Sequence, residues 1–498
     1  MEKNVKLIHR LVPIIALFFL IVIGVIIIPQ VTSTTTEFTD ARGNVKTITE
    51  PGQSMPLEII FVLATIISVI NLYFLKFTWE EIMESIIEKM KQLIPAMIIL
   101  FSIGILIGGW VYSGTIPLLI YYGVDIINPQ YMYLVAFLVT SVFSVFTGTS
   151  WGSIGTIGVV LIGIGSAIDS NLAITAAAIV GGAYFGDKLS PLSDTTNIAA
   201  LATNVPLMAH IRSMMNTTVP SFIISAILYW IIGLNVNLNV DSSDVKNSVS
   251  ELKEGISTIY NFDGLFQILM LIIPILIVLY GSLTQKPTVP VLITSAFIAG
   301  FIGMAVNGFS FMQMFTSLNT GFDTKTFFPN VKVSENVTEL LDRGGIYSMK
   351  EAVTIAITVF IYVGTLNRIN AINGVIDYIL FWVKNKPQVI IASLFSTGLT
   401  NAMSSNQMAT SYIIAEAFGP KYDELGVPRK VLSRSIEDYG TMLESLLPWT
   451  ATGIYVFATL GVSPTEYWYF QFVSLIGFII AIVLALTGIG NFYKEKER

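Results

Sequence analysis

Long apolar segments of helical length alternate with short polar segments along almost the whole chain. A helix needs about 20 residues to cross a hydrocarbon core of ~30 Å, whereas the strands of a membrane barrel are about ten residues long and alternate in polarity. The pattern therefore predicts an all-α polytopic membrane protein. The shorter segments are expected to be half-helices or hairpin arms. The predicted apolar segments are residues 11–29, 57–77, 93–122, 131–146, 154–168, 172–185, 219–234, 265–280, 289–306, 352–366, 375–383, 389–400, 411–418, 436–447, 449–460 and 470–486.

The N-terminal segment predicts a membrane span and an orientation. Residues 11–29 are long enough to cross the bilayer, and no small-residue cleavage site follows them, so we interpret them as a first span rather than a signal peptide. Lys3, Lys6 and Arg10 before this span outweigh Arg42 and Lys46 after it. The N-terminus is therefore expected in the cytoplasm and the chain in the plasma membrane.

Polar segments divide the chain. Residues 32–55 and 237–263 are expected to be external connectors, and residues 78–92 carry apolar side chains at helical spacing, as in an interfacial amphipathic helix. We predict an N-terminal transmembrane repeat at residues 1–236, a polar connector at 237–263 and a C-terminal transmembrane repeat at 264–498.

Two polar runs interrupt the apolar pattern at corresponding places. Residues 146–156 and 399–407 are rich in Gly, Ser, Thr and Asn, and each is followed by a motif with an acid and a proline, at residues 187–197 and 444–448. Asp187 and Glu444 are 257 positions apart, and so are Pro191 and Pro448. Broken segments in matching positions of two halves are typical of transporters. We therefore expect two inverted repeats, with broken helices or re-entrant hairpins that meet at the bilayer midplane.

The composition agrees with a multi-span protein and excludes other classes. The chain is 53% hydrophobic and 12% charged, and its mean hydropathy is +0.72. It has no Cys and two His, which argues against thiolate or His-ligated metal centres. No basic stripe suggests nucleic-acid binding, and no nucleophile–base pair suggests an enzyme. We expect no cofactor.

The polar runs are candidates for a Na⁺ site. A desolvated Na⁺ needs about five or six oxygen ligands, and backbone carbonyls are free where a helix is interrupted. Packing of small residues between helices is the alternative explanation for the Gly and Ser residues, but it does not require Asn. The candidate ion- or substrate-binding residues are Thr147, Thr149, Ser150, Asp187, Ser193, Asp194, Thr195, Thr196, Asn197, Thr400, Asn401, Ser404, Ser405, Asn406, Glu437 and Glu444.

The acids mark the expected ion path, because carboxylates inside a membrane are costly. Asp187 and Glu444 each stand four residues before a proline, which frees their own backbone carbonyl from the helix. Two alternatives remain open: Lys188 could pair with Asp187 at the interface, and Glu437 with Asp438 could be a solvated helix start beside Arg434.

These motifs resemble the signature of the NhaC family of Na⁺/H⁺ antiporters. The resemblance rests on residues 148–152 (Gly-Thr-Ser-Trp-Gly), 181–197, 109–110, 113–117, 121–123 and the His-Ile-Arg of residues 210–212, and it extends over most of the chain. It implies secondary active transport by a protein of two inverted repeats. Other similar proteins exchange malate for lactate or carry an amino acid with Na⁺.

Charge balance bears on the cargo. Acids outnumber Lys188, Arg368 and Arg434 in or near the broken segments, which favours exchange of Na⁺ for H⁺ by alternating access, with carboxylates shared between the two cations. Na⁺-coupled organic anion exchange, such as malate/lactate antiport, and amino-acid transport are the alternatives. The expected partners are Na⁺, H⁺ and the lipid bilayer, with a small carboxylate and a second copy of the chain, as a homodimer, as further candidates.

Overall fold

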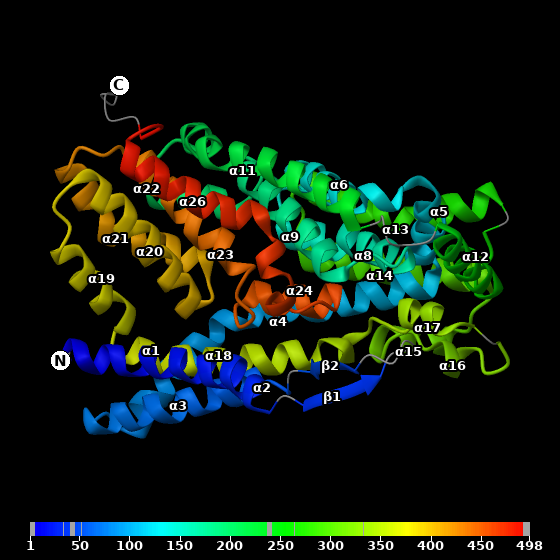
Figure 1. Ribbon diagram of the computed structural model, residues 1–498, viewed down its shortest axis with the longest axis horizontal. Helices are drawn as coiled ribbons and strands as arrows, with labels where there is room; N and C mark the ends of the chain where they lie inside the picture. The colour runs from blue at the N-terminus through cyan, green and yellow to red at the C-terminus, as the bar shows by residue number, and fades with distance from the viewer. Residues whose placement is uncertain are drawn as a thin grey trace. The chain divides into compact units, whose positions relative to one another are not determined.

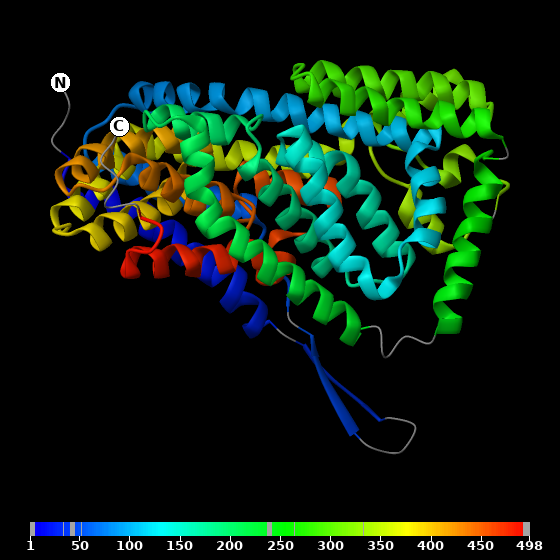
Figure 2. The ribbon, with the colours of Figure 1, turned by 90° about the horizontal axis from the view of Figure 1, so that it is seen from above.

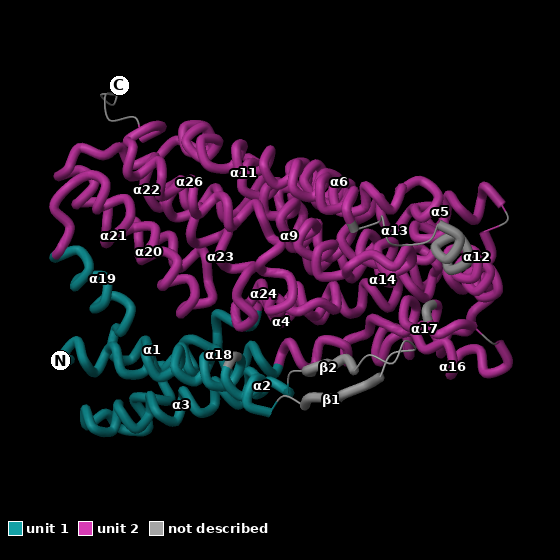
Figure 3. The backbone as a smooth tube through the Cα atoms, viewed as in Figure 1, with its two compact units in different colours: residues 1–94, 354–381 teal, residues 95–353, 382–498 magenta. Residues whose placement is uncertain are grey.

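The computed structural model describes residues 5–32, 34–39, 45–50, 52–236, 242–262, 264–331 and 333–491. The chain forms two compact units, which Figure 3 shows in different colours. Unit 1 comprises Met1–Ile94 and Thr354–Phe381, and unit 2 comprises Pro95–Val353 and Trp382–Arg498. Lys3 and part of the predicted connector (residues 237–241 and 263) lie outside the described residues.

Unit 1 is built on α1 and α3, which pack against each other. Asn71 of α3 donates to the carbonyl of His9 in α1 at 2.8 Å, and Tyr362 donates to the carbonyl of Pro13 at 2.9 Å. The elements are α1 (Leu7–Ile21), η1 (Val22–Ile27), α2 (Ile28–Val31), β1 (Thr34–Thr39), β2 (Val45–Glu50), α3 (Leu57–Phe74) and α19 (Ala371–Phe381), with parts of α4 (Trp79–Ser113) and α18 (Lys350–Arg368).

One prediction about unit 1 needs correction. Residues 78–92 do not form a separate interfacial helix, because α4 continues through them from Trp79 to Ser113. The segment predicted as a connector contains an antiparallel hairpin of β1 and β2, with Thr34 opposite Glu50. Runs of Thr with alternating residues favour this strand pairing, which the hydropathy pattern did not reveal.

Unit 2 contains the two polar runs. Its first part has α5 (Thr115–Ile126), η2 (Pro129–Tyr131), α6 (Met132–Thr147), α7 (Ser150–Ser153), η3 (Ile154–Gly158), α8 (Val159–Ala167), α9 (Leu172–Leu189), α10 (Asp194–Ala202), α11 (Leu207–Val236), α12 (Ser242–Ile259), α13 (Leu265–Leu283), α14 (Thr288–Asn307), α15 (Phe311–Asn319), α16 (Thr324–Phe327), α17 (Glu335–Leu341) and η5 (Ile346–Met349). Its second part has α20 (Lys386–Ser404), α21 (Gln407–Glu424), α22 (Arg429–Ile436), η6 (Glu437–Thr441), α23 (Met442–Glu444), α24 (Ala451–Leu460), α25 (Pro464–Tyr467), η7 (Trp468–Phe470) and α26 (Phe472–Thr487).

The prediction of a polytopic helical membrane protein is confirmed. Among the described residues, ten helices are long and apolar enough to cross a membrane, or up to eleven if the bent pair Pro464–Phe470 and Phe472–Thr487 is one span. The predicted span at residues 93–122 is divided, because α4 ends at Ser113 and Gly114 has a φ of 92° before α5 begins. Within the described part of the connector, Ser242–Ile259 form the helix α12.

The helices that carry the first run and its acid motif, α6 and α9, lie side by side in Figures 1 and 2. Their backbones approach closely because Gly182 and Gly186 face α6. A Cβ atom at Gly182 would lie 2.4 Å from the carbonyl oxygen of Phe137, and one at Gly186 would lie 2.5 Å from that of Ser141. Small residues four apart allow such packing between membrane helices. The end of α9, with Asp187, is thereby fixed beside the end of α6.

Candidate functional site

The first polar run breaks a helix. α6 ends at Thr147, Gly148 turns the chain with a φ of 68°, and Thr149 caps α7 by accepting the amide of Gly152 at 3.2 Å. A Cβ atom at Gly148 would lie 2.5 Å from that of Leu192, so a side chain does not fit there. The hydroxyl of Thr147 lies 3.2 Å from that of Ser153. Helix end, turn and new helix therefore lie within four residues.

The second polar run repeats this geometry 257 positions later. Ser405 takes the left-handed place of Gly148, with a φ of 52°, and Asn406 caps α21 by accepting the amide of Ala409 at 2.9 Å. The hydroxyls of Ser404 and Thr410 lie 3.0 Å apart, as those of Thr147 and Ser153 do. The caps and hydroxyl contacts of the two breaks thus correspond position by position.

The correspondence extends to the helices that pack on each break. Ser144 donates to the carbonyl of Ala183 at 2.6 Å, and Asn401 donates to that of Gly440 at 2.9 Å. Ser193 caps α10 by accepting the amide of Thr196 at 3.3 Å, and Thr450 caps α24 by accepting the amide of Gly453 at 3.0 Å. Each of these pairs is again 257 positions apart. The halves share a local architecture, while their inversion and the division at residues 237–263 stay predictions.

Three of the predicted acids are buried near the breaks. Asp187 accepts a hydrogen bond from Ser150 at 2.8 Å. Glu444 is buried at the end of α23. Glu437, with an exposed fraction of 0%, has no hydrogen-bond partner for either carboxylate oxygen within the described residues. Proline was expected to leave the backbone carbonyls of Asp187 and Glu444 without a helical partner. Each of these carbonyls accepts a hydrogen bond from a hydroxyl group, from Thr196 at Asp187 and from Thr450 at Glu444.

Other buried side-chain oxygens of α20 and η6 also lack a hydrogen-bond partner within the described part of the chain. The side-chain oxygens of Thr400, Asn401 and Thr441 are also buried and make no hydrogen bond within the described part of the chain. Thr400 and Asn401 lie in α20, and Glu437 and Thr441 lie in the π-helical segment η6, which packs on α20. Buried polar atoms without partners are rare and mark sites that take up an ion or water. π-Helical turns also concentrate at functional sites.

A buried ion pair lies next to this oxygen set. Lys188 pairs with Asp438, whose same oxygen accepts the hydroxyl of Thr217 at 2.8 Å. Both charged side chains are almost inaccessible, with exposed fractions of 3% and 2%. Two alternatives from the sequence are therefore wrong: Lys188 pairs with Asp438 rather than with Asp187, and Glu437 with Asp438 is not a solvated helix start.

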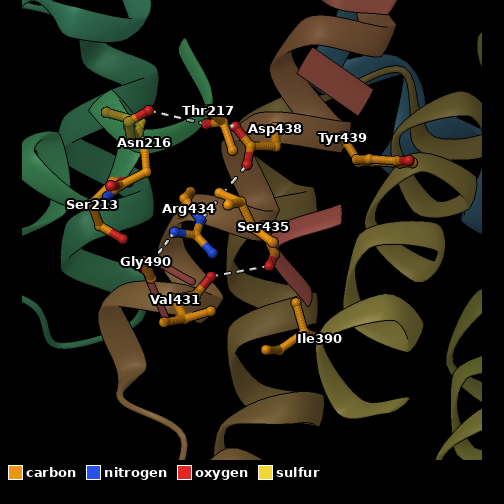
Figure 4. Close-up of polar contacts among 12 residues, drawn as sticks. Ser213, Asn216, Thr217, Ile390, Val431, Arg434, Ser435, Asp438, Tyr439 and Gly490 are labelled. Atoms are coloured by element: carbon orange, nitrogen blue, oxygen red, sulfur yellow. Dashed lines mark hydrogen bonds and ion pairs between the residues drawn. The ribbon is translucent and has the colours of Figure 1, made fainter. Parts of the chain in front are cut away.

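Arg434 lies one helical turn before Asp438, and Figure 4 shows it between Asp438 and the C-terminal segment. Its Nε lies 3.9 Å from the second Asp438 oxygen, and its terminal nitrogens donate to the Gly490 carbonyl at 2.8 Å and to Asn491 at 2.6 Å. The guanidinium group is therefore already engaged by protein atoms.

The predicted residues after Pro191 lie in the turn between α9 and α10 and at the start of α10, where Thr196 bonds the backbone carbonyl of Asp187. Asp194 is exposed at the start of α10. Ser193 and Thr195 bond each other at 3.1 Å, and Asn197 donates to the carbonyls of Pro191 and Ser193. These side chains stabilise the turn between α9 and α10.

A cavity of about 280 Å³ opens beside the first break. Thr147, Thr149 and Asp194 line it, together with Gln285 and Lys286 of the turn between α13 and α14. The cavity gives the first break a polar approach, with one acidic and one basic side chain in its wall.

Sequence reasoning did not select Lys188, Asp438 or Thr441 as site residues. The signal for the ion pair was present, because an ionisable side chain inside a membrane is expected to have a partner. No such signal existed for Thr441, since hydroxyl residues are common in both halves.

Interrupted helices with buried charges, among ten candidate spans, define a membrane transporter. The particular family follows from comparison: residues 182–489 match the Na⁺/H⁺ antiporter family, and the chain belongs to it. The predicted resemblance is thereby confirmed.

Three relatives cover most of the chain. A Haemophilus influenzae protein named an uncharacterized Na⁺/H⁺ antiporter is 40% identical over 88% of this chain and 92% of its own length. The Na⁺/H⁺ antiporter NhaC of Bacillus subtilis is 32% identical, over 86% of this chain and 91% of its own. The malate-2H⁺/Na⁺-lactate antiporter of Bacillus subtilis is 30% identical, over 89% of this chain and 92% of its own.

Proposed function

We propose that this protein exchanges Na⁺ for H⁺ across the plasma membrane by alternating access, with its N-terminus in the cytoplasm. The observation that carries the proposal is the set of unpartnered oxygens on Thr400, Asn401, Glu437 and Thr441. A buried carboxylate without donors is costly to leave charged, so it holds either a proton or a cation. In this proposal, two hydroxyl oxygens and an amide oxygen act as further ligands of Na⁺. A proton on the carboxylate does not need these ligands.

The exchange follows from this competition. When Glu437 carries a proton, the shell has lost its negative charge and binds Na⁺ weakly. When the proton leaves, the carboxylate and its neighbours take up Na⁺. Only one of the two ions is bound at a time, which is the condition for coupled exchange. The relatives named as Na⁺/H⁺ antiporters support this cargo.

Na⁺-coupled exchange of small carboxylates is the second candidate. The relative named as a malate-2H⁺/Na⁺-lactate antiporter and Lys286 in the wall of the 280 Å³ cavity favour it. Against it, Lys188 is paired with Asp438 and Arg434 is bonded to Gly490 and Asn491. Neither of these two buried positive side chains is left for a carboxylate, so cation exchange remains the better-supported function.

The test uses purified protein in liposomes that contain a pH-sensitive dye. With an imposed pH gradient, added Na⁺ is expected to drive proton movement, whereas K⁺, malate and lactate are not. Lower pH protonates the shared carboxylate, so the apparent affinity for Na⁺ is expected to weaken as pH falls, by up to about tenfold per pH unit where the proton dominates. An affinity that is constant between about pH 6 and 9 would contradict a shared site, and a response to malate or lactate alone would favour the second candidate.

A further inference from the structure

Two amide side chains connect the second break with the π-helical segment η6. Asn401, near the end of α20, donates to the side-chain oxygen of Gln407 at 2.8 Å and to the backbone carbonyl of Gly440 at 2.9 Å. Gln407, the first residue of α21, donates to the backbone carbonyl of Ile436 at 3.3 Å. Both side chains are buried, with exposed fractions of 0% and 4%. Gln407, which was not among the predicted site residues, therefore joins α21 to α20 and η6.

These hydrogen bonds fix the orientation of both amide groups. An amide side chain has one acceptor oxygen and an NH₂ group with two hydrogens, whereas a backbone carbonyl only accepts. The carbonyl of Ile436 requires the nitrogen of Gln407, so the oxygen of Gln407 is left to accept from Asn401. Together with the carbonyl of Gly440, it uses both hydrogens of Asn401. The atom that remains, Oδ1 of Asn401, is buried and has no hydrogen-bond partner within the described residues.

The position of the Gln407 amide depends on Gly440. A Cβ atom at Gly440 would lie 2.3 Å from the side-chain oxygen of Gln407 and 2.7 Å from its nitrogen. Any larger residue would therefore displace this amide group. The glycine keeps Gln407 within reach of both Asn401 and Ile436.

The first break has a corresponding contact. Ser150 lies 257 positions before Gln407 and is likewise the first residue of the new helix, here α7. It donates to Asp187 at 2.8 Å. In both breaks, the residue that begins the new helix thus bonds a buried candidate for ion binding.

We propose that Gln407 is a positioning residue for Na⁺, which holds the amide group of Asn401 so that Oδ1 is presented as a ligand. The inference rests on the proposed function, in which this oxygen binds Na⁺. An unrestrained amide can turn by 180° and present its NH₂ group, which repels a cation. Gln407 opposes this turn, because Oδ1 would then face the oxygens of Gln407 and Gly440 without a hydrogen between them. The ligand is therefore ordered before the ion arrives, which favours binding.

The experiment measures the Na⁺ concentration for half-maximal exchange and the maximal rate in liposomes. Gln407→Met keeps the length of the side chain but removes its donor and acceptor. It is expected to raise the half-maximal Na⁺ concentration about fivefold, the effect of one hydrogen bond. The maximal rate is expected to change less than about twofold, because binding rather than transport is weakened. Gly440→Ala displaces the same amide and is expected to raise the half-maximal concentration about threefold.

A double-mutant cycle separates positioning from a purely structural role. In an Asn401→Ala background, no amide is left to orient. Gln407→Met is therefore expected to change the half-maximal Na⁺ concentration of that background by less than about twofold. A shift as large as in the wild-type background would mean that Gln407 does not act through Asn401.

Thr397→Val is the matched control. Thr397 is buried one turn before Asn401 in α20 and donates to the carbonyl of Ser393 in its own helix at 2.6 Å. This variant is expected to leave both parameters unchanged. A wild-type half-maximal concentration in Gln407→Met, or an equal shift in Thr397→Val, would overturn the proposal. If Gln407→Met does not fold, unchanged parameters in Gly440→Ala contradict it equally.

The two proposals fail differently. Normal exchange by the wild type with unaltered Na⁺ dependence in Gln407→Met refutes the role of Gln407 alone. If the wild type shows no Na⁺-driven proton movement, the proposed function fails, and the rise in melting temperature with added Na⁺ measures cation binding alone. The Na⁺ concentration that gives half of this rise must then be higher in Gln407→Met and unchanged in Thr397→Val. A wild type that Na⁺ does not stabilise refutes both proposals.

Discussion

The two breaks share their backbone and capping contacts but differ in the side chains behind them. At positions 257 apart, Thr400, Glu437 and Thr441 of the second half correspond to Phe143, Val180 and Tyr184 of the first. The second half thus has unpartnered oxygens where the first has largely apolar side chains. The first break instead borders a polar cavity and has an acid, Asp187, that already accepts a hydrogen bond.

The contacts that the two halves share and the side chains in which they differ therefore have different roles. Caps such as Thr149 and Asn406 serve the helix ends, since each accepts the amide three residues later. Such contacts are needed wherever a helix is broken, whatever the cargo. The ion chemistry we propose depends on the positions at which the halves differ, so the halves should respond unequally to matched substitutions.

The largest expected effect is at Glu437. Glu437→Gln removes the negative charge of the oxygen shell while keeping its shape, and Na⁺/H⁺ exchange in liposomes is expected to fall at least about hundredfold. Asp194→Asn makes the same kind of change at an exposed acid and is expected to stay within about threefold. Comparable losses in both variants would show that the buried shell has no special part in exchange.

The next effect concerns the ion pair that joins the halves. Lys188→Gln leaves the buried Asp438 carboxylate with the Thr217 hydroxyl and, at 3.9 Å, Arg434, and is expected to cost up to about 3–5 kcal/mol of stability, measured by thermal unfolding in detergent. The double variant Lys188→Gln with Asp438→Asn removes both charges and is expected to recover most of this loss. Simple addition of the two single effects would mean that the pair does not stabilise the contact between the halves.

The smallest effect compares the two left-handed turn residues. Gly148→Ala places a Cβ atom against Leu192 and is expected to destabilise the protein by about 1–3 kcal/mol. Ser405→Gly relieves a left-handed cost of about 1 kcal/mol but loses the hydroxyl that accepts the amide of Ala451 at 2.7 Å. The net change is expected to be close to zero by the same unfolding measurement. A large loss in Ser405→Gly would show that its hydroxyl, rather than its backbone, maintains the second break.

The breaks were predictable because they depend on local chemistry. Gly148 and Ser405 are followed by the capping residues Thr149 and Asn406, and this order ends one helix and begins another in any context. The shift of 257 positions then identified the second break from the first.

The partners of the buried charges were not predictable from spacing. Lys188 and Asp438 are 250 positions apart and meet only after α9 packs near η6. Asp194 was expected at the site because it belongs to an oxygen-rich motif, yet the motif's hydroxyls and amide serve the turn and leave this acid exposed. Which oxygens remain without partners is decided by tertiary packing.

The contacts of Arg434 have a practical consequence for the design of C-terminal tags and truncations. Its buried guanidinium group bonds the Gly490 carbonyl and the Asn491 side chain. Fluorescent or affinity tags joined after Arg498 are expected to leave these bonds intact. Deletions that reach residue 490 remove both bonds and leave the buried guanidinium group of Arg434 without these acceptors. A series of C-terminal truncations should therefore show an abrupt loss of expressed protein at residues 490–491 rather than a gradual decline.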